Sequence, residues 1–203
     1  YIPRTADCGE HLPSIVADYW PWISSPSQLP TWGSFNWTLQ TCLYLTDSGF
    51  DCQIVRSLPS EGIVIAHRDF LSPALRPDRN LLMVCLLADK RSPRSSGVHP
   101  FAQVHIVQNP GDEAIRNPSA LWPAYYMPQW PQPGLIPRDP VRGDRFENAA
   151  FVGDREGKHL ARELKDASWP ARLRELGLTW RRVPRESWHD YSDIDLVVAV
   201  RSF

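Results

Sequence analysis

The chain has 203 residues, of which 42% are hydrophobic and 22% are charged. These fractions lie close to the globular averages of roughly 45–50% and about 25%, so the composition excludes a disordered tail, a collagen-like repeat and a coiled coil. With 22 basic and 23 acidic residues, the formal net charge is −1. A nearly neutral chain is not expected to carry the large basic surface that binds nucleic acid.

Apolar runs and cysteine spacing exclude two further classes. The longest apolar runs, such as residues 81–88, are far shorter than the roughly 20 residues of a membrane-spanning helix, so no integral membrane segment is expected. The four cysteines are Cys8, Cys42, Cys52 and Cys85. They show no C-x-x-C spacing and have no histidines at ligand spacing, so no zinc site is expected. We interpret them as reduced thiols in a cytoplasmic protein.

The 22 basic residues are all arginine except Lys90, Lys158 and Lys165. A GC-rich genome would produce this bias without any functional cause. The alternative is repeated recognition of phosphate or carboxylate groups, for which the planar guanidinium is suited.

In the first half, the residues predict a helix followed by strands. The helix is expected over residues 34–49, with Ser34 as its N-cap and Gly49 at its C-terminal end. Strand-like runs follow at residues 52–57, 62–67, 81–88 and 102–108. The runs at 62–67 and 81–88 are continuously aliphatic, which is typical of strands buried on both faces of a parallel sheet.

The second half begins after a segment of different character. Residues 110–142 are too rich in proline for either regular element, and they predict a tight aromatic crossover between two halves. Strands are then expected at 149–152, 179–183 and 194–200, with a helix over 158–176 that is interrupted near Pro170. This order is the opening of a Rossmann-like unit. The predicted domains are therefore 1–109, the crossover 110–142, and 143–203.

Polar residues at the ends of the aliphatic runs are the candidate site, because ligands of open α/β sheets bind outside the carboxyl ends of the strands. An acid or an imidazole there suits acid–base catalysis, and an arginine suits a pyrophosphate. The catalytic candidates are His67, Asp69 and Asp89, and the binding candidates of this half are Arg68, Arg91, His105 and Asn109. The alternative interpretation is a capping aspartate beside a salt-bridged arginine at each turn.

The second half offers a phosphate site and a formal metal motif. Gly153 and Asp154 follow the strand at 149–152 and lead to a helix, whose N-terminus could bind a phosphate. The full G-x-G-x-x-G fingerprint is absent. Asp193 and Asp195 form a D-x-D pattern, but they precede a strand, so we interpret them as loop and strand-edge residues. No metal ligands are assigned, and a divalent metal is kept as an open cofactor.

Five segments together resemble a group of bacterial glycosyltransferase-like proteins with two Rossmann-like halves, the GT-B arrangement. They are residues 58–69, 102–109, 128–138, 142–153 and 188–201. The resemblance implies an α/β fold of parallel sheets and a sugar nucleotide bound between the halves, with Gly153 and Arg201 near the donor. We expect Arg142 and Arg201, like Arg68 and Arg91, to clamp phosphates. In such enzymes the second half continues beyond the strand matched by 194–200, so a reduced or truncated second half is expected here.

The resulting expectation is an enzyme that transfers a sugar from a nucleoside-diphosphate sugar to a sugar or small-molecule acceptor. Two alternatives stay open. One is a nucleotide-sugar pyranose–furanose mutase on a glycosyltransferase-like fold, which would need no acceptor pocket. The other is a non-catalytic module that binds a sugar or a nucleotide.

Overall fold

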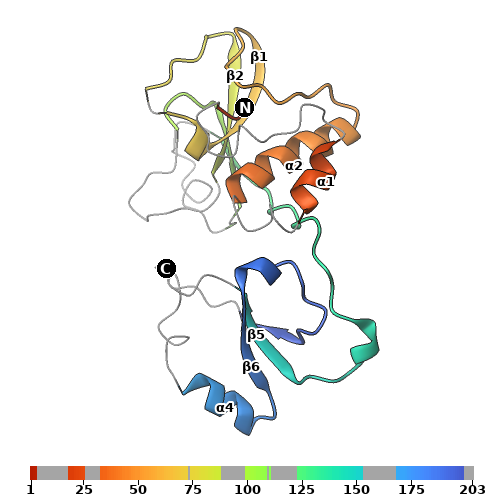
Figure 1. Ribbon diagram of the computed structural model, residues 1–203. Coiled ribbons are helices and arrows are strands. Elements are labelled where there is room, and N and C mark those ends of the chain that lie inside the picture. Colours follow the sequence, from red (N-terminus) through yellow and green to blue (C-terminus); the bar gives the residue numbers. More distant parts are fainter. Residues whose placement is uncertain are drawn as a thin grey trace. The chain divides into compact units, whose positions relative to one another are not determined.

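The computed structural model of the chain describes residues 1–3, 18–25, 33–72, 74–87, 99–108, 110, 123–152 and 168–198. The chain forms two compact units. Unit 1 comprises Tyr1–Trp22 and Trp32–Pro131, and unit 2 comprises Ile23–Thr31 and Gln132–Phe203. Each unit contains its own sheet of parallel strands together with helical segments (Figure 1). The expected α/β class with parallel sheets is therefore confirmed.

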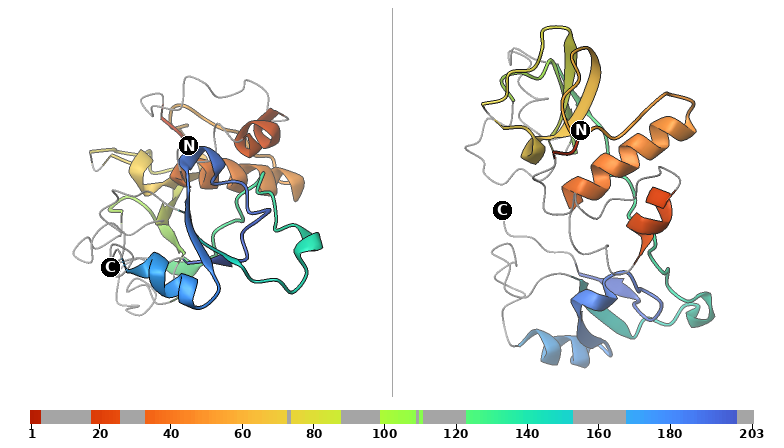
Figure 2. Two further views of the ribbon diagram at one scale, coloured as in Figure 1. Left: turned by 60° about the horizontal axis from the view of Figure 1, so that its bottom comes forward. Right: turned by 45° about the horizontal axis from the view of Figure 1, so that its top comes forward.

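Unit 1 contains a four-stranded parallel sheet in the order β1-β2-β3-β4. Its strands are β1 (Gly62–His67), β2 (Leu81–Leu87), β3 (Val104–Val107) and β4 (Ala124–Tyr126). The helices are α1 (Tyr19–Ser24), which crosses the sequence boundary between the units, α2 (Gly33–Asp47) and the 3-10 helix η3 (Arg68–Phe70). Figure 2 shows α2 lying along this sheet from two further directions.

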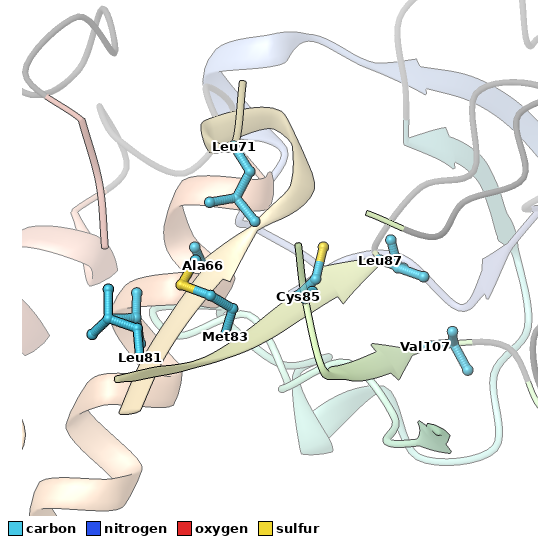
Figure 3. Close-up of a cluster of buried hydrophobic side chains, with 9 residues drawn as sticks. Ala66, Leu71, Leu81, Met83, Cys85, Leu87 and Val107 are labelled. Atoms are coloured by element: carbon cyan, nitrogen blue, oxygen red, sulfur yellow. The ribbon is translucent and has the colours of Figure 1, made fainter. Parts of the chain in front are cut away.

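The two faces of this sheet carry alternate residues of each strand, as the period of two requires. One face carries a buried apolar cluster of Val64, Ala66, Leu71, Leu81, Met83, Cys85, Leu87, Ala102 and Val107 (Figure 3). On the opposite face, Trp37 of α2 packs against Leu86, and Ile65 and Ile106 contact this pair. The helix therefore covers the face that the apolar cluster leaves open.

The strands β1 and β2 are less buried than their aliphatic sequences indicate. Ile63 and Leu82 are partners in the parallel register, yet they are 70% and 40% exposed. Further along the same strands, the partners Ala66 and Cys85 are fully buried on one face, and the partners His67 and Leu86 are buried on the other. The expectation of burial on both faces is thus right for the carboxyl-terminal part of each strand and wrong at its beginning.

Helix α2 ends where the sequence predicts. Gly49 has a φ of 88°, its N–H donates to the Thr46 carbonyl (2.9 Å), and the Phe50 N–H donates to the Leu45 carbonyl (3.0 Å). This pair of bonds is a Schellman motif, which satisfies carbonyls of the last helical turn and requires a left-handed residue after the helix. The predicted helix over 34–49 is confirmed, with Ser34 inside its first turn rather than capping it.

Two expectations in unit 1 are wrong. Residues 52–57 form no strand; the Val55 carbonyl accepts a bond from the Ile2 N–H (3.2 Å), but no ladder develops. Conversely, β4 lies inside the segment 110–142, for which the proline content predicts neither helix nor strand. Its prolines flank the strand, so the Pro123 carbonyl still accepts from His105 and Met127 still donates to Val107. Proline removes a donor only at its own position.

Unit 2 contains a three-stranded parallel sheet in the order β6-β5-β7. Its strands are β5 (Asn148–Val152), β6 (Thr179–Val183) and β7 (Leu196–Val197), and its helices are α4 (Trp169–Glu175), η4 (Pro140–Arg142) and η6 (Arg185–Ser187). Its core joins Ala150, Val183 and Ile194. Pro170 lies in the first turn of α4 and does not interrupt it, whereas residues 158–167 of the expected helix fall outside the described residues.

The cap at Gly49 gives a test of the fold of unit 1. A Cβ at residue 49 would meet no atom within 4 Å, so Gly49→Ala adds backbone strain without a clash. We expect a loss of roughly 1–2 kcal/mol in the free energy of unfolding, measured by urea denaturation. Gly49→Asn should lose less, because asparagine tolerates the left-handed region better. Equal stability of the wild type and Gly49→Ala would contradict this account of the helix end.

Candidate functional site

The carboxyl end of β1 brings three predicted site residues into one turn. His67 closes the strand, is 1% exposed, and caps η3 by accepting the Asp69 backbone N–H at its Nδ1 atom (3.1 Å). A carboxylate oxygen of Asp69 lies 3.7 Å from the same nitrogen, and the Asp69 side chain is 34% exposed. Arg68, between them, is half-buried. The turn therefore presents an acid and a cation beside a buried imidazole.

Cys85 of β2 lies within the electrostatic range of this turn. Burial raises the pKa of its thiol to about 12, Arg68 opposes that shift, and Asp69 adds to it. The thiol is therefore protonated at neutral pH, which removes it as a nucleophile because the thiolate is the reactive form. Cys85 is fully buried in the apolar cluster, where it packs as a small hydrophobic residue.

His105, predicted to bind a nucleotide sugar, occupies the interior of β3. It is fully buried and accepts the His99 backbone N–H at Nε2 (3.0 Å). A neutral imidazole that accepts at Nε2 carries its proton on Nδ1, and Nδ1 meets no hydrogen-bond partner among the described residues. The bond to His99 holds the start of the 99–103 segment against the strand. The predicted role of His105 in ligand binding stays a prediction.

His99 repeats the local arrangement of His67. It is 5% exposed, and its Nδ1 accepts the N–H of Phe101, two residues further on (3.4 Å). Burial lowers the pKa of both His99 and His105, and the proximity of His99 lowers that of His105 further. Both imidazoles are therefore neutral at neutral pH, as their acceptor roles require.

In unit 2, the predicted phosphate clamp Arg142 binds a carboxylate of the same unit. Its Nε and Nη2 atoms donate to the two oxygens of Asp195 (2.8 and 2.7 Å), and Arg138 donates to the first of these oxygens (2.8 Å). The backbone N–H groups of Glu147 and Asn148 donate to the second oxygen (both 2.9 Å). The Asp195 side chain is 0% exposed. Its hydrogen bonds, above all that of Arg142, hold the pKa of Asp195 well below its usual range.

This carboxylate cluster, Arg138–Arg142–Asp195, lies at the amino ends of two strands. Asn148 begins β5, and Asp195 directly precedes β7. In open parallel sheets the ligand edge is the opposite, carboxyl edge. Arg142 lies at this amino edge, and two of its guanidinium N–H groups already donate to Asp195 of the same unit. Both facts favour a structural role for Arg142, and its predicted contact with a phosphate stays a prediction.

The D-x-D pair is also accounted for by contacts within unit 2. Asp193 pairs with Arg181, and its backbone carbonyl accepts from the side-chain amide of Asn148 (2.8 Å). Both aspartates therefore serve the loop and the strand edge, as interpreted from the sequence. In the part of the chain that is described, no three histidine, cysteine, aspartate or glutamate side chains gather as metal ligands would.

The remaining predicted residues fall outside the described residues. They are Asp89, Arg91, Asn109, Gly153, Asp154 and Arg201. Among the described residues, the structure brings together His67, Arg68 and Asp69 in one turn, whereas His105 lies within β3 and Arg142 belongs to unit 2. Sequence reasoning assigned no role to Arg138, and no local pattern marks it.

Three comparisons with known proteins were made, against models of protein families, curated proteins and solved structures, and none of them yields a match. Among the described residues, no helix is long and apolar enough to cross a lipid bilayer.

The buried imidazoles predict a pH dependence of stability. His99 and His105 have a lowered pKa in the folded chain, whereas the unfolded chain titrates near the ordinary value of 6.5. The unfolded chain therefore binds more protons below that pH, so the contribution of the two histidines to stability is complete above about 6.5 and is lost as the pH falls from there through their lower pKa in the folded chain. Urea midpoints measured between pH 8 and pH 5 should decrease. The decrease should be shallower in His105→Gln, because the amide oxygen can accept the same N–H without titrating. An equally steep decrease in that variant would contradict this assignment.

The carboxylate cluster predicts that Arg142→Lys destabilises the fold. Lysine offers a point charge and cannot donate to both oxygens of Asp195 in the fork geometry. We expect a lower thermal midpoint, with the affinity of the folded protein for a nucleoside diphosphate unchanged. Arg145→Lys is the matched control, because the Arg145 side chain donates to backbone carbonyls of the same loop. A loss of affinity without a loss of stability would assign Arg142 to the ligand instead.

Proposed function

We propose that this chain binds a nucleoside-diphosphate sugar and transfers the sugar to a hydroxyl acceptor. The observation that carries the proposal is the parallel order β6-β5-β7 in unit 2. The first strand of this sheet lies between the two that follow it, which is the 2-1-3 order found around the ligand crevice of doubly wound sheets.

The order suggests where the nucleotide binds. In doubly wound sheets the crevice lies outside the carboxyl ends of the first and third strands, which here are β5 and β7. Gly153 and Asp154 follow β5 directly in the sequence. We therefore assign the diphosphate to this edge of unit 2. The GT-B arrangement of two Rossmann-like halves is part of the proposal.

Unit 1 supplies the acid–base group. Strands β1, β2 and β3 are parallel, so the residues that follow them are expected at one edge. Asp69 is partly exposed at that edge and Arg68 adjoins it. Asp89, Arg91 and Asn109 follow β2 and β3 in the sequence and stay candidate contacts of the ligand.

The proposed reaction needs few groups. Asp69 takes the proton of the acceptor hydroxyl while the acceptor oxygen forms a bond to the anomeric carbon. The bond from that carbon to the diphosphate breaks, and the electron pair leaves with the nucleoside diphosphate. The charge on the leaving phosphate needs a cation, for which guanidinium groups are suited, and the candidates are Arg68, Arg91 and Arg201.

Titration calorimetry with several nucleoside diphosphates tests the binding step, and incubation with a panel of nucleotide sugars, followed by NMR, tests the reaction. We expect binding of at least one diphosphate and, when water is the only acceptor, its slow release from the matching sugar nucleotide by hydrolysis. Asp69→Asn should retain binding and lose roughly 10²–10⁴-fold in the release rate, the usual contribution of an acid–base group.

The other outcomes separate the alternatives. A change of ring size in the sugar would identify a mutase, and binding without any reaction would identify a non-catalytic module. Absence of binding for every nucleotide tested would overturn the sugar-nucleotide proposal as a whole. A chelator added to the same reactions decides whether a divalent metal takes part.

A further inference from the structure

The imidazole of His67 is tied to the backbone of the turn that it precedes. Its Nδ1 atom accepts the Asp69 N–H (3.1 Å), and its ring meets the ring of Phe70 at an edge, with the centroids 5.9 Å apart. The residue is 1% exposed. In contrast, the Asp69 side chain is 34% exposed.

This bond fixes the proton position on the ring. A nitrogen that accepts a backbone N–H carries no hydrogen, so the proton of the neutral imidazole resides on Nε2. Nδ1 could take a proton only by giving up the bond to Asp69, and Nε2 already carries one. In this arrangement His67 has no nitrogen that can serve as a base while the turn stays intact.

The far side of the turn is fixed as well. The Leu71 N–H donates to the Arg68 carbonyl (3.0 Å), and the Leu71 side chain is buried in the apolar cluster above Ala66 and Met83 (Figure 3). The three residues of η3 are therefore held by His67 before them and by Leu71 after them. Because both anchors are buried, the direction in which the Asp69 carboxylate leaves the turn is set by them.

We infer that His67 is a positioning residue, which holds Asp69 and Arg68 at the carboxyl end of β1 through its Nδ1 atom, and that it is not the base of the reaction. The inference rests on the proposed function. It divides the roles within the triplet: the partly exposed acid exchanges the proton, and the buried imidazole fixes the geometry of the turn.

The variants His67→Asn and His67→Ala separate these roles. The Oδ1 atom of asparagine can accept the N–H two residues further on, as in an Asx-turn, but it cannot act as a base. Alanine removes both abilities. We expect the release rate of the nucleoside diphosphate to fall in His67→Ala and to be restored largely in His67→Asn. A loss of roughly 10²–10⁴-fold in both variants is the signature of a base and would overturn the inference.

Asp78→Ala is the matched control. The Asp78 carboxylate accepts the Asn80 N–H (3.0 Å) and so makes the same two-residue contact in the loop between η3 and β2, on an exposed residue. The Asp78→Ala variant should release the nucleoside diphosphate at the same rate as the wild type. A loss as large as that of His67→Ala would show that any disturbance of this loop has the same effect, and it would remove the specific role of His67.

Nitrogen-15 NMR of the histidine side chains reads the proton position directly and needs no ligand. At pH 8 we expect the His67 signals, identified by their loss in His67→Asn, to show protonated Nε2 and unprotonated Nδ1. Protonated Nδ1 would overturn the inference even if the protein transfers sugar. The expected tautomer in a protein that binds no nucleotide would leave the role of His67 in the turn intact and overturn the proposed function alone.

Discussion

Parallel pairing of the strands is the constraint on which the rest of this structure depends. In both sheets it gathers the carboxyl ends of the strands at one edge and their amino ends at the other. The two polar clusters described above, the turn at residues 67–69 and the carboxylate cluster around Asp195, lie at opposite kinds of strand end. His67, Arg68 and Asp69 lie at the carboxyl end of β1, and open parallel sheets bind ligands outside the carboxyl ends of their strands. Asp195 and the two arginines that bind it lie at the amino ends of β5 and β7. Arginine and aspartate therefore occur in two different positions, at the carboxyl end of a strand in unit 1 and at the amino ends of strands in unit 2.

Sequence patterns predicted the parts of the fold that depend on local chemistry. The bounds of β1 follow from an aliphatic run, and the end of α2 follows from the glycine stop at Gly49. The bounds of β6 were also predicted correctly, although only Val183 in this strand is aliphatic. Sequence patterns failed where the presence of a strand depends on whether a neighbouring strand is there to pair with it. Residues 52–57 have strand-like composition but find no ladder, and β4 pairs with β3 in spite of the prolines around it.

The candidate site was predictable only in part, for the same reason. His67, Arg68 and Asp69 are adjacent in sequence and follow a recognisable strand, so their proximity could be predicted. The use of Arg142 could not, because its partner Asp195 is 53 positions away and the contact depends on how two strands begin. Burial of a histidine is equally hidden in sequence: His105 lies in an alternating run, and the structure shows that its imidazole accepts a backbone N–H.

The contacts of Asp195 also bear on how the chain assembles during synthesis. The sheet of unit 1 grows in chain order, since each strand pairs with the one before it. In unit 2, the Arg138 side chain and the Asn148 backbone N–H donate to the carboxylate of Asp195, which is synthesised 57 and 47 residues later, respectively. Domains form as units during synthesis, and contacts of long sequence separation form slowly. Unit 1 can therefore fold during synthesis. In unit 2, Arg138 and Arg142 can make these hydrogen bonds only after Asp195 has been synthesised.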